Sequence, residues 1–506
     1  MASLTRVEAG TRSALIDVSR YTLDLDLDRG ATSFGSSSTV RFGCAEPGAS
    51  TFLDVKTQQL QRVTLNGVDV DLRGFDGERI TLNDLAAENE VVVTATMRYS
   101  NDGQGLHRAV DPADDQHYVY GHSFLDAAPR VFGCFDQPDL KAPFDVLVTA
   151  PPEWIVLGNG AATRVGLRNW SLATTRPLAT YFFTVCAGPY ASVLAEHDGI
   201  PLGLHARASL GEPLERQAEQ MLTITRASFD YYHSLFGIRY PFGEYHQVFV
   251  PEFNAGAMEN PGCVTLRDQY LFRGATSHDE VLTRSSTISH EMAHMWFGDL
   301  VTMRWWDDLW LNESFAEYMS HRTLYETAEF TDAWVDASMA RKPWGYAAER
   351  MPSTHPVAGS PAPDAQSALQ NFDGISYAKG AATLRQLIAH IGDAAFIDGV
   401  EDYLRAHAYG NAALADFLGA MERASGKDLG AWADAWLRTA GLDKVSVETA
   451  ARDGVITPAK VRRLHPAADP PAPPPTFDFS RCTPRPAVFP VPTSVPDNEP
   501  PLADLH

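Results

Sequence analysis

Hydrophobic and polar residues alternate over much of the first 190 residues, as expected for half-buried β-strands. In residues 21–28, Tyr and Leu alternate with Thr and Asp, and the apolar run of residues 91–96 predicts a buried strand. Residues 154–157 predict another strand, and Gly158-Asn159-Gly160 after it favours a hairpin turn. A phosphate-binding loop is the weaker interpretation, because a third glycine is absent. Residues 1–190 are therefore expected to form a β domain.

The pattern changes after about residue 190, where helical periodicity becomes dominant. A short sheet is expected to contain residues 247–250 and 256–260. Ser277-His278-Asp279-Glu280 is a capping box that marks the start of a helix. Helices are predicted over about residues 278–297, 312–327, 376–391, 393–407, 412–424 and 429–439. Residues 191–440 are expected to form a second, mainly helical domain.

The end of the chain follows neither pattern. Residues 441–465 offer at most a short strand pair. Residues 466–506 are rich in proline, and such a segment cannot form a packed core, so it is predicted to be a disordered tail.

Composition and charge narrow the classes of function. The chain has 506 residues, 44% of them hydrophobic, which is enough for roughly two to four globular domains. A net charge of −23 argues against nucleic acid and anionic membranes as partners, since both require basic surfaces. The five cysteines show no paired spacing, and no apolar run is long enough for a signal peptide or a membrane span. These observations predict a cytoplasmic protein with reduced thiols; its oligomeric state is left open.

The strongest chemical signal is a His-Glu-x-x-His motif. His290 and His294 are four residues apart on a predicted helix, so their rings point to the same side and can share one tetrahedral Zn²⁺. Glu313 follows on the next predicted helix as the third ligand, which leaves one position open, as in catalytic zinc sites. Glu291 lies between the histidines and can act on a metal-bound water as general base. A buried histidine pair on an apolar helix face is the alternative interpretation.

Further segments resemble a known family. The run Gly256-Ala257-Met258-Glu259-Asn260, the run Tyr377-Ala378-Lys379-Gly380 and residues 130–138 occur in order around the zinc motif. Together they resemble the zinc aminopeptidases of the aminopeptidase N type over roughly residues 10–440. The resemblance implies an α+β fold, in which a saddle-like β domain precedes a thermolysin-like, mainly helical catalytic domain that holds one Zn²⁺ per chain. Family members usually continue into further domains, so the chain resembles a C-terminally shortened member.

The resemblance also implies roles for individual residues. Tyr377 matches the family's catalytic tyrosine, whose phenol stabilises the oxyanion. Glu259 would pair with the α-ammonium of a peptide or small amide, so that only the first peptide bond meets the metal. The backbone of Gly256 and Ala257 would bind the extended substrate, with Met258 and Asn260 completing this substrate-binding segment.

Two further expectations concern the surroundings of the zinc site. Met258 is expected to line the side-chain pocket. Asp299 and Glu317 are candidates for orienting the histidine rings, with solvated helix charges as the alternative.

One part of the family pattern is altered. Where relatives carry a further acid or amide that binds the α-ammonium, this chain has His122-Ser123-Phe124, and Pro129 replaces the first of two arginines. The leading hypothesis is a zinc aminopeptidase. A specialised zinc hydrolase of a small amide, peptide or epoxide, with altered amine recognition, is the second. A non-catalytic relative is the third, although a complete set of site residues argues against it.

Overall fold

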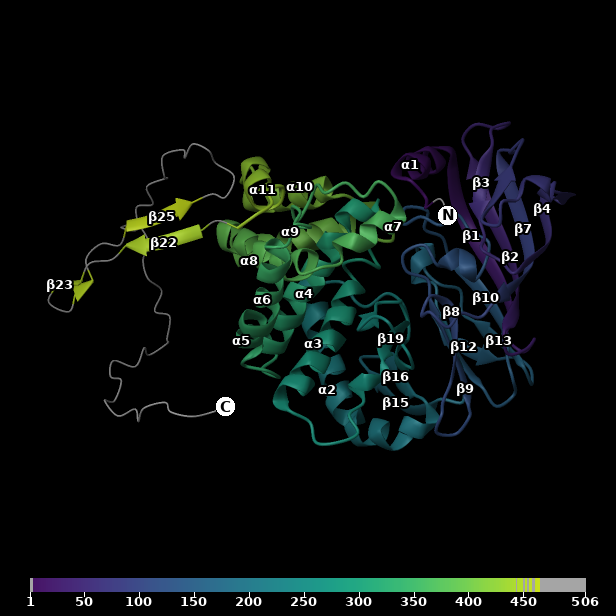
Figure 1. Ribbon diagram of the computed structural model, residues 1–506, viewed down its shortest axis with the longest axis horizontal. Helices are drawn as coiled ribbons and strands as arrows, with labels where there is room; N and C mark the ends of the chain where they lie inside the picture. The colour runs from purple at the N-terminus through teal and green to yellow at the C-terminus, as the bar shows by residue number, and fades with distance from the viewer. Residues whose placement is uncertain (1–2, 443, 449–450, 453–454, 457–459, 465–506) are drawn as a thin grey trace. The chain divides into compact units, whose positions relative to one another are not determined.

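The computed structural model of the chain describes residues 3–442, 444–448, 451–452, 455–456 and 460–464. The chain divides into two compact units, Met1–Gly441 and Leu442–His506. In the first unit, strands dominate the N-terminal part and helices dominate the rest (Figure 1). The predicted α+β class, with a β-rich region followed by a mainly helical one, is confirmed.

An eight-stranded sheet forms the framework of the N-terminal part, with the strand order β12-β13-β10-β1-β2-β7-β4-β5. In β1 (Ile16–Asp26), Tyr21, Leu23 and Leu25 are fully buried, which confirms the strand predicted from their alternation with polar residues. The predicted buried run of residues 91–96 lies in β7 (Glu88–Arg98). The other strands of this sheet are β2 (Ser33–Cys44), β4 (Gln59–Leu65), β5 (Val68–Asp69), β10 (Phe144–Thr149), β12 (Ala162–Arg164) and β13 (Asn169–Leu172).

Smaller sheets complete the N-terminal part. A four-stranded sheet has the order β11-β14-β9-β8, and β3 pairs with β6. The helix α1 (Arg6–Leu15) precedes all of them, with a capping box formed by Thr5 and Glu8. The strands are β3 (Thr51–Asp54), β6 (Arg79–Leu82), β8 (Gly105–Val110), β9 (His117–His122), β11 (Ile155–Gly158) and β14 (Val185–Gly188).

The hairpin predicted at residues 158–160 is wrong. The strand β11 pairs with β14, whereas β12 belongs to the eight-stranded sheet, so the chain crosses between sheets at this point. Asn159 holds the crossing, because its side-chain amide donates to the carbonyls of Phe182 and Pro261. A Cβ at Gly160 would lie 2.1 Å from the carbonyl oxygen of Ala173. Glycine is thus required for close packing of two segments, rather than for a tight turn.

The second part of the unit contains a five-stranded sheet with the order β15-β16-β17-β19-β18. The strands β16, β17 and β19 run parallel, and β15 and β18 pair antiparallel at the two edges. The helix α2 (Gly211–Phe236) packs against β15, β16 and α3. The strands are β15 (Ala191–His197), β16 (Ile200–Ala206), β17 (Tyr245–Val250), β18 (Ala257–Met258) and β19 (Cys263–Arg267).

The remaining helices follow this sheet, and most match a predicted one. The longest are α3 (His278–His294) and α4 (Leu309–Glu326), which pack against each other. A π-helical turn, η9 (Ile375–Lys379), leads directly into α8 (Gly380–Ile391). The others are α5 (Ala333–Asp336), α6 (Lys342–Glu349), α7 (Ala365–Ala368), α9 (Asp393–Ala406), α10 (Leu414–Ser425) and α11 (Gly430–Trp436), and β20 (Thr302–Met303) pairs with β21 (Asn411–Ala412).

The two parts of the first unit are joined by specific polar contacts. Lys141, just before β10, is half-buried, and its ammonium donates to the carbonyls of Asp299, Leu300 and Gly410. At the N-terminus, the amide of Arg6 donates to the carbonyl of Pro363. The turn after α3 is therefore held from the β-rich part of the unit.

In the second unit, β22 (Lys444–Glu448) pairs antiparallel with β25 (Lys460–Leu464), and β23 (Ala451–Arg452) pairs with β24 (Val455–Ile456). The proline-rich segment 466–506 lies outside the described residues. Among the described helices, none combines the length and the apolar character needed to cross a membrane.

Candidate metal centre and cleft

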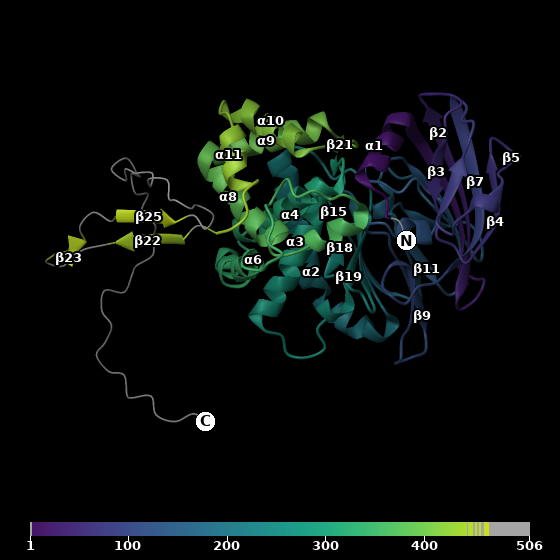
Figure 2. The ribbon, with the colours of Figure 1, turned by 45° about the horizontal axis from the view of Figure 1, so that its top comes forward.

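The helix α3 carries the His-Glu-x-x-His motif. Its start is fixed by the predicted capping box, because the amide of Glu280 donates to Ser277 Oγ at 3.2 Å and the amide of Ser277 donates to Glu280 Oε2 at 2.8 Å. Leu282, Ile288 and Met292 bury one face of the helix. Figure 2 shows α3 beside α4, with β18 and β19 next to them.

The two histidines and Glu313 form a compact triad. His290 Nε2 and His294 Nε2 are 3.1 Å apart, and Glu313 Oε2 lies 3.3 Å from the first and 3.4 Å from the second. A tetrahedral zinc ion with bonds of about 2.0–2.1 Å has ligand–ligand edges of about 3.3 Å. Two imidazoles and one carboxylate, so spaced, fit Zn²⁺ with one position left for water or substrate. The three predicted ligands are the residues that the fold brings together.

The electrostatics of the triad agree with a ligand set. Burial acts to raise the pKa of Glu313, but the adjacent His294 and the hydrogen bonds from both imidazoles outweigh it and hold this pKa at about 2. Glu313 is therefore anionic at neutral pH. His294 Nδ1 faces the carbonyl oxygen of Phe297 at 3.1 Å, which fixes the ring so that Nε2 points to the triad.

The triad opens into a cleft of about 380 Å³. Glu291 and Tyr377 both line it, and the Tyr377 ring stacks on His290 with a centroid separation of 6.1 Å. Burial, and then the charge of Glu313, raise the pKa of the Tyr377 phenol well above its ordinary value. Tyr377 therefore keeps its proton and can act as a hydrogen-bond donor.

The segment around Glu259 forms one wall of the cleft. The strand β18 is the edge of its sheet, paired on one side with β19 through Ala257–Leu266 and Met258–Thr265. Gly256, Ala257 and Glu259 line the cleft. The backbone edge of β18 that does not face β19 is thus available to an extended ligand.

Two residues of this predicted substrate-binding segment face away from the cleft. Met258 and Asn260 are buried, at 3% and 0% exposure, and neither is among the residues that line the cleft. Alternation along an extended strand explains this, because neighbouring side chains point to opposite faces. Met258 thus packs in the core and does not contribute to the lining of this cleft.

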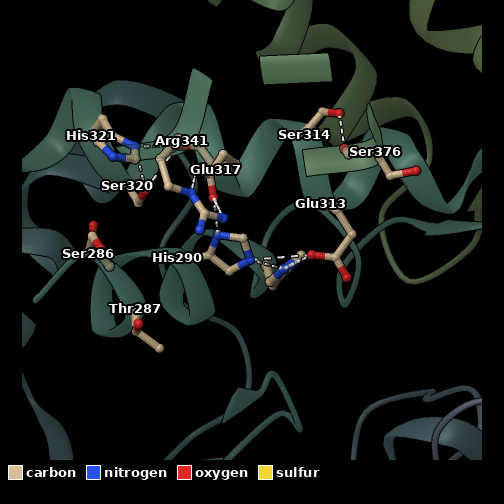
Figure 3. A network of polar contacts seen from close by, with 12 residues as sticks. Ser286, Thr287, His290, Glu313, Ser314, Glu317, Ser320, His321, Arg341 and Ser376 are labelled. Atoms are coloured by element: carbon tan, nitrogen blue, oxygen red, sulfur yellow. Dashed lines mark hydrogen bonds and ion pairs between the residues drawn. The ribbon is translucent and has the colours of Figure 1, made fainter. Parts of the chain in front are cut away.

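The two residues predicted to orient the histidines differ in their surroundings. Glu317 Oε2 lies 3.9 Å from His290 Nδ1, and Arg341 donates to both oxygens of Glu317, at 2.6 and 2.9 Å (Figure 3). Asp299 is fully buried, and neither of its carboxylate oxygens has a hydrogen-bond partner among the described residues. Arg341 was not among the predicted site residues.

Phe124, at the altered position of the family pattern, lies in an aromatic cluster. Its ring packs edge-on against those of Tyr181, Trp306 and Phe372, with centroid separations of 5.8, 6.2 and 5.1 Å. Phe372 in turn reaches Tyr377 at 6.2 Å. The cluster therefore connects Phe124 to the edge of the cleft without placing it in the lining.

The fold and the site define a class: proteins that combine a β-rich N-terminal region with a helical region carrying a His-His-Glu metal triad. Residues 18–182 match the Peptidase M1 N-terminal domain, and residues 220–436 match the Peptidase family M1 domain. The chain belongs to peptidase family M1.

Named relatives agree with this assignment. The chain is 45% identical to Aminopeptidase N of Streptomyces lividans over 92% of its length and 55% of the relative's. It is 34% identical to Tricorn protease-interacting factor F2 of Thermoplasma acidophilum over 64% of its length and 41% of the relative's. Aminopeptidase 2, mitochondrial, of Saccharomyces cerevisiae is 30% identical over 78% of this chain and 44% of the relative. The chain thus spans about half the length of these relatives.

Proposed function

We propose that the chain is a zinc-dependent aminopeptidase that hydrolyses the N-terminal bond of peptides. The observation that carries this proposal is the single cleft that contains the triad, Glu291, Tyr377, Glu259 and the free edge of β18. Zinc, when bound by His290, His294 and Glu313, would supply Lewis-acid chemistry that polarises a carbonyl and acidifies water.

The remaining steps fall to the chain's own residues. Glu291 takes the proton from the attacking water and passes it to the leaving amine. The Tyr377 phenol donates a hydrogen bond to the oxyanion that develops on the attacked carbonyl. Glu259 pairs with the substrate's α-ammonium and so sets the register, while the edge of β18 hydrogen-bonds the extended peptide.

Location and domain limits are part of the same proposal. Cys44, Cys134, Cys186 and Cys263 are buried free thiols, which suits the reducing cytoplasm. We assign residues 1–190 to an N-terminal domain and residues 191–440 to the catalytic domain, because β14 ends the first group of sheets and β15 begins a new one.

The test compares a free-amine aminoacyl anilide with its N-acetylated counterpart. We expect about one zinc per chain and at least a hundredfold preference for the free amine. In Glu291→Gln, the ligands are intact, so zinc should be retained while turnover falls at least a hundredfold. Equal rates on the two substrates would exclude an aminopeptidase, and full activity of Glu291→Gln would exclude this base.

The cluster around Phe124 favours a second candidate, a zinc hydrolase of related mechanism whose substrate presents its amine differently. No carboxylate is available at position 124, and the rings of His122, Tyr181, Trp306 and Phe372 pack against Phe124. If an amine-binding group is absent here, Phe124→Glu should raise kcat/KM for aminoacyl anilides roughly tenfold or more, whereas Phe124→Leu, which adds neither a charge nor a hydrogen-bond acceptor, should not. A folded Phe124→Glu variant with unchanged kinetics would favour a differently built amine site.

A further inference from the structure

One end of the cleft carries a guanidinium group to which the proposed chemistry assigns no task. Arg341 closes a π-helical turn, η7 (Ala337–Arg341), and its side chain remains 37% exposed where it lines the cleft. Among the residues that line this cleft, it is the sole lysine or arginine. The other charged groups of the lining are mostly carboxylates, so the position of this cation matters for any charged substrate.

Only one edge of this guanidinium is used within the chain. Nε and Nη2 donate to the two oxygens of Glu317, and the plane lies over the Trp344 ring at 4.6 Å. Nη1 makes no hydrogen bond to a described residue. A guanidinium presents five N–H donors in a fixed plane. The edge formed by Nη1 and Nη2 can therefore donate two hydrogen bonds to a second carboxylate.

Arg341 lies beside His290, on the side of the ring that faces away from the other two ligands. His290 Nε2 faces Glu313 and His294, whereas its Nδ1 faces Glu317, the partner of Arg341. Glu259 and Arg341 both line the cleft that contains the triad. A peptide whose amine is held at Glu259 and whose first bond meets the triad therefore has its later residues within the cleft that Arg341 lines.

Further polar groups gather at the Arg341 end. Ser286 and Thr287 on α3 and Ser320 on α4 line the cleft there, on the same side of His290 as Arg341 (Figure 3). Glu317 is paired with Arg341, and His321 Nε2 lies 3.5 Å from Asp336. Each carboxylate at this end already faces a cationic or proton-donating partner, and the three hydroxyls already donate to backbone carbonyls. An incoming anion therefore meets the free N–H donors of Arg341.

We propose that Arg341 binds a carboxylate located downstream of the scissile bond. The carboxylate can be the C-terminus of a peptide of two or three residues, or an aspartate or glutamate side chain. This inference rests on the proposed aminopeptidase function and names a substrate class for it: short or acidic peptides with a free amine.

The experiment uses matched peptide pairs. A dipeptide and a tripeptide of alanine are each compared with their C-terminal amides, which tests the terminal carboxylate. Ala-Asp-amide is compared with Ala-Asn-amide, which tests a side-chain carboxylate. A charge-assisted hydrogen bond predicts that kcat/KM favours the carboxylate member of at least one pair by roughly tenfold to a hundredfold.

Variants assign the preference to a residue. In Arg341→Met the acid-to-amide ratio should fall to about one, whatever happens to the absolute rate. The double variant Glu317→Gln/Arg341→Met removes the carboxylate that the single variant leaves unpaired, and it should show the same loss of preference. The matched control is Arg385→Met, because this guanidinium stacks on Trp334 at 4.2 Å and does not line the cleft, so its ratio should equal that of the unaltered chain.

A second readout does not depend on turnover. Calorimetric titration of Glu291→Gln with the same pairs should show the same preference in Kd. Ratios near one for all pairs, with anilides still hydrolysed, would overturn the carboxylate site and leave the aminopeptidase intact. A strong preference that persists in Arg341→Met would overturn the role of Arg341. Carboxylate-dependent binding without hydrolysis of any substrate would instead overturn the aminopeptidase.

Discussion

The helices α3 and α4 both supply metal ligands, yet they are built in opposite ways. The helix α3 is amphipathic, with an exposed first turn closed by a capping box and an apolar face against the core. From Leu309 to Leu324, every residue of α4 is buried, although several are charged or polar. A helix of the second kind cannot be stabilised by hydrophobic burial alone, because each buried polar group needs a partner.

Those partners come from distant segments of the chain. Ser314 Oγ donates to the carbonyl of Ser376 at 2.5 Å, and Glu317 is paired with Arg341. Arg322 donates to both oxygens of Asp393, at 2.6 and 2.9 Å. The polar residues of α4 thus connect the triad to η7, η9 and α9. We expect substitutions in α4 and its partners to disturb the metal site, whereas a substitution at the start of α3 should affect only the first turn of that helix.

The largest effect is expected from Glu313→Gln on α4. The amide keeps the shape of the side chain but removes the anionic ligand. Loss of a residue that only hydrogen-bonds to a ligand typically lowers metal affinity or activity about 10–100-fold, so zinc affinity and turnover should each fall by more than this in Glu313→Gln. Zinc content and kcat/KM are the measurements. Glu317→Gln, one turn further on, is the matched control and should lose less of both. Full zinc retention by Glu313→Gln would show that this residue is not a ligand.

A large effect is also expected where α4 meets η9. A Cβ at Gly380 would lie 1.7 Å from Ser314 Oγ, so Gly380→Ala forces α4 and the turn carrying Tyr377 apart. Overpacking should cost about 1–3 kcal/mol of unfolding free energy, and displacement of Tyr377 by about 1 Å should lower kcat roughly a hundredfold. Denaturant unfolding and steady-state kinetics measure the two effects.

The same substitution at another helical glycine provides the control. In α10, a Cβ at Gly419 would meet only Arg423 Nη1, at 3.4 Å. Gly419→Ala should therefore be neutral, or stabilising by up to about 1 kcal/mol, with unchanged kinetics. Similar behaviour of the two alanine variants would contradict the close contact between Gly380 and Ser314.

The difference between the two helices also explains what could be predicted from sequence. The start of α3 was predicted because a capping box and an apolar face are local signals. Glu313 could be found from its spacing to the motif, but the start of α4 was placed three residues late, because a helix that is buried all round shows no periodic boundary. Arg341 could not be found, since its pairing with Glu317 depends on tertiary packing.

Other errors have equally specific causes. The helix α2 was not predicted, although its buried Leu214, Ala218, Met221 and Thr225 recur at helical spacing. Gly158-Asn159-Gly160 carries the composition of a turn but makes a crossing between sheets, held by contacts of Asn159 to distant carbonyls. Local composition thus identified the strand β11, but not its pairing with β14.

A moderate loss of stability is expected at the far end of α4. Arg322→Met removes the ion pair with Asp393 and the hydrogen bond to the Tyr231 hydroxyl. Arg322 is buried but Asp393 is half exposed, so the cost should be about 2 kcal/mol, below that of a fully buried pair. Arg423→Met is the control, because the pair of Arg423 with Asp402 is exposed on both sides and should contribute about 0–1 kcal/mol. Equal losses in the two variants would argue against a structural role for buried pairing in α4.

The smallest effect is expected at the start of α3. Ser277→Ala removes the hydroxyl that accepts from the amide of Glu280, which should cost about 1 kcal/mol in a denaturant titration. Ser277→Asp supplies an equivalent acceptor and should restore stability. Because Ser277 precedes His290 by more than three helical turns, only the first turn should fray, and zinc content and kcat should not change. A marked fall in zinc content in Ser277→Ala would mean that α3 transmits disturbance along its length, as we expect only of α4.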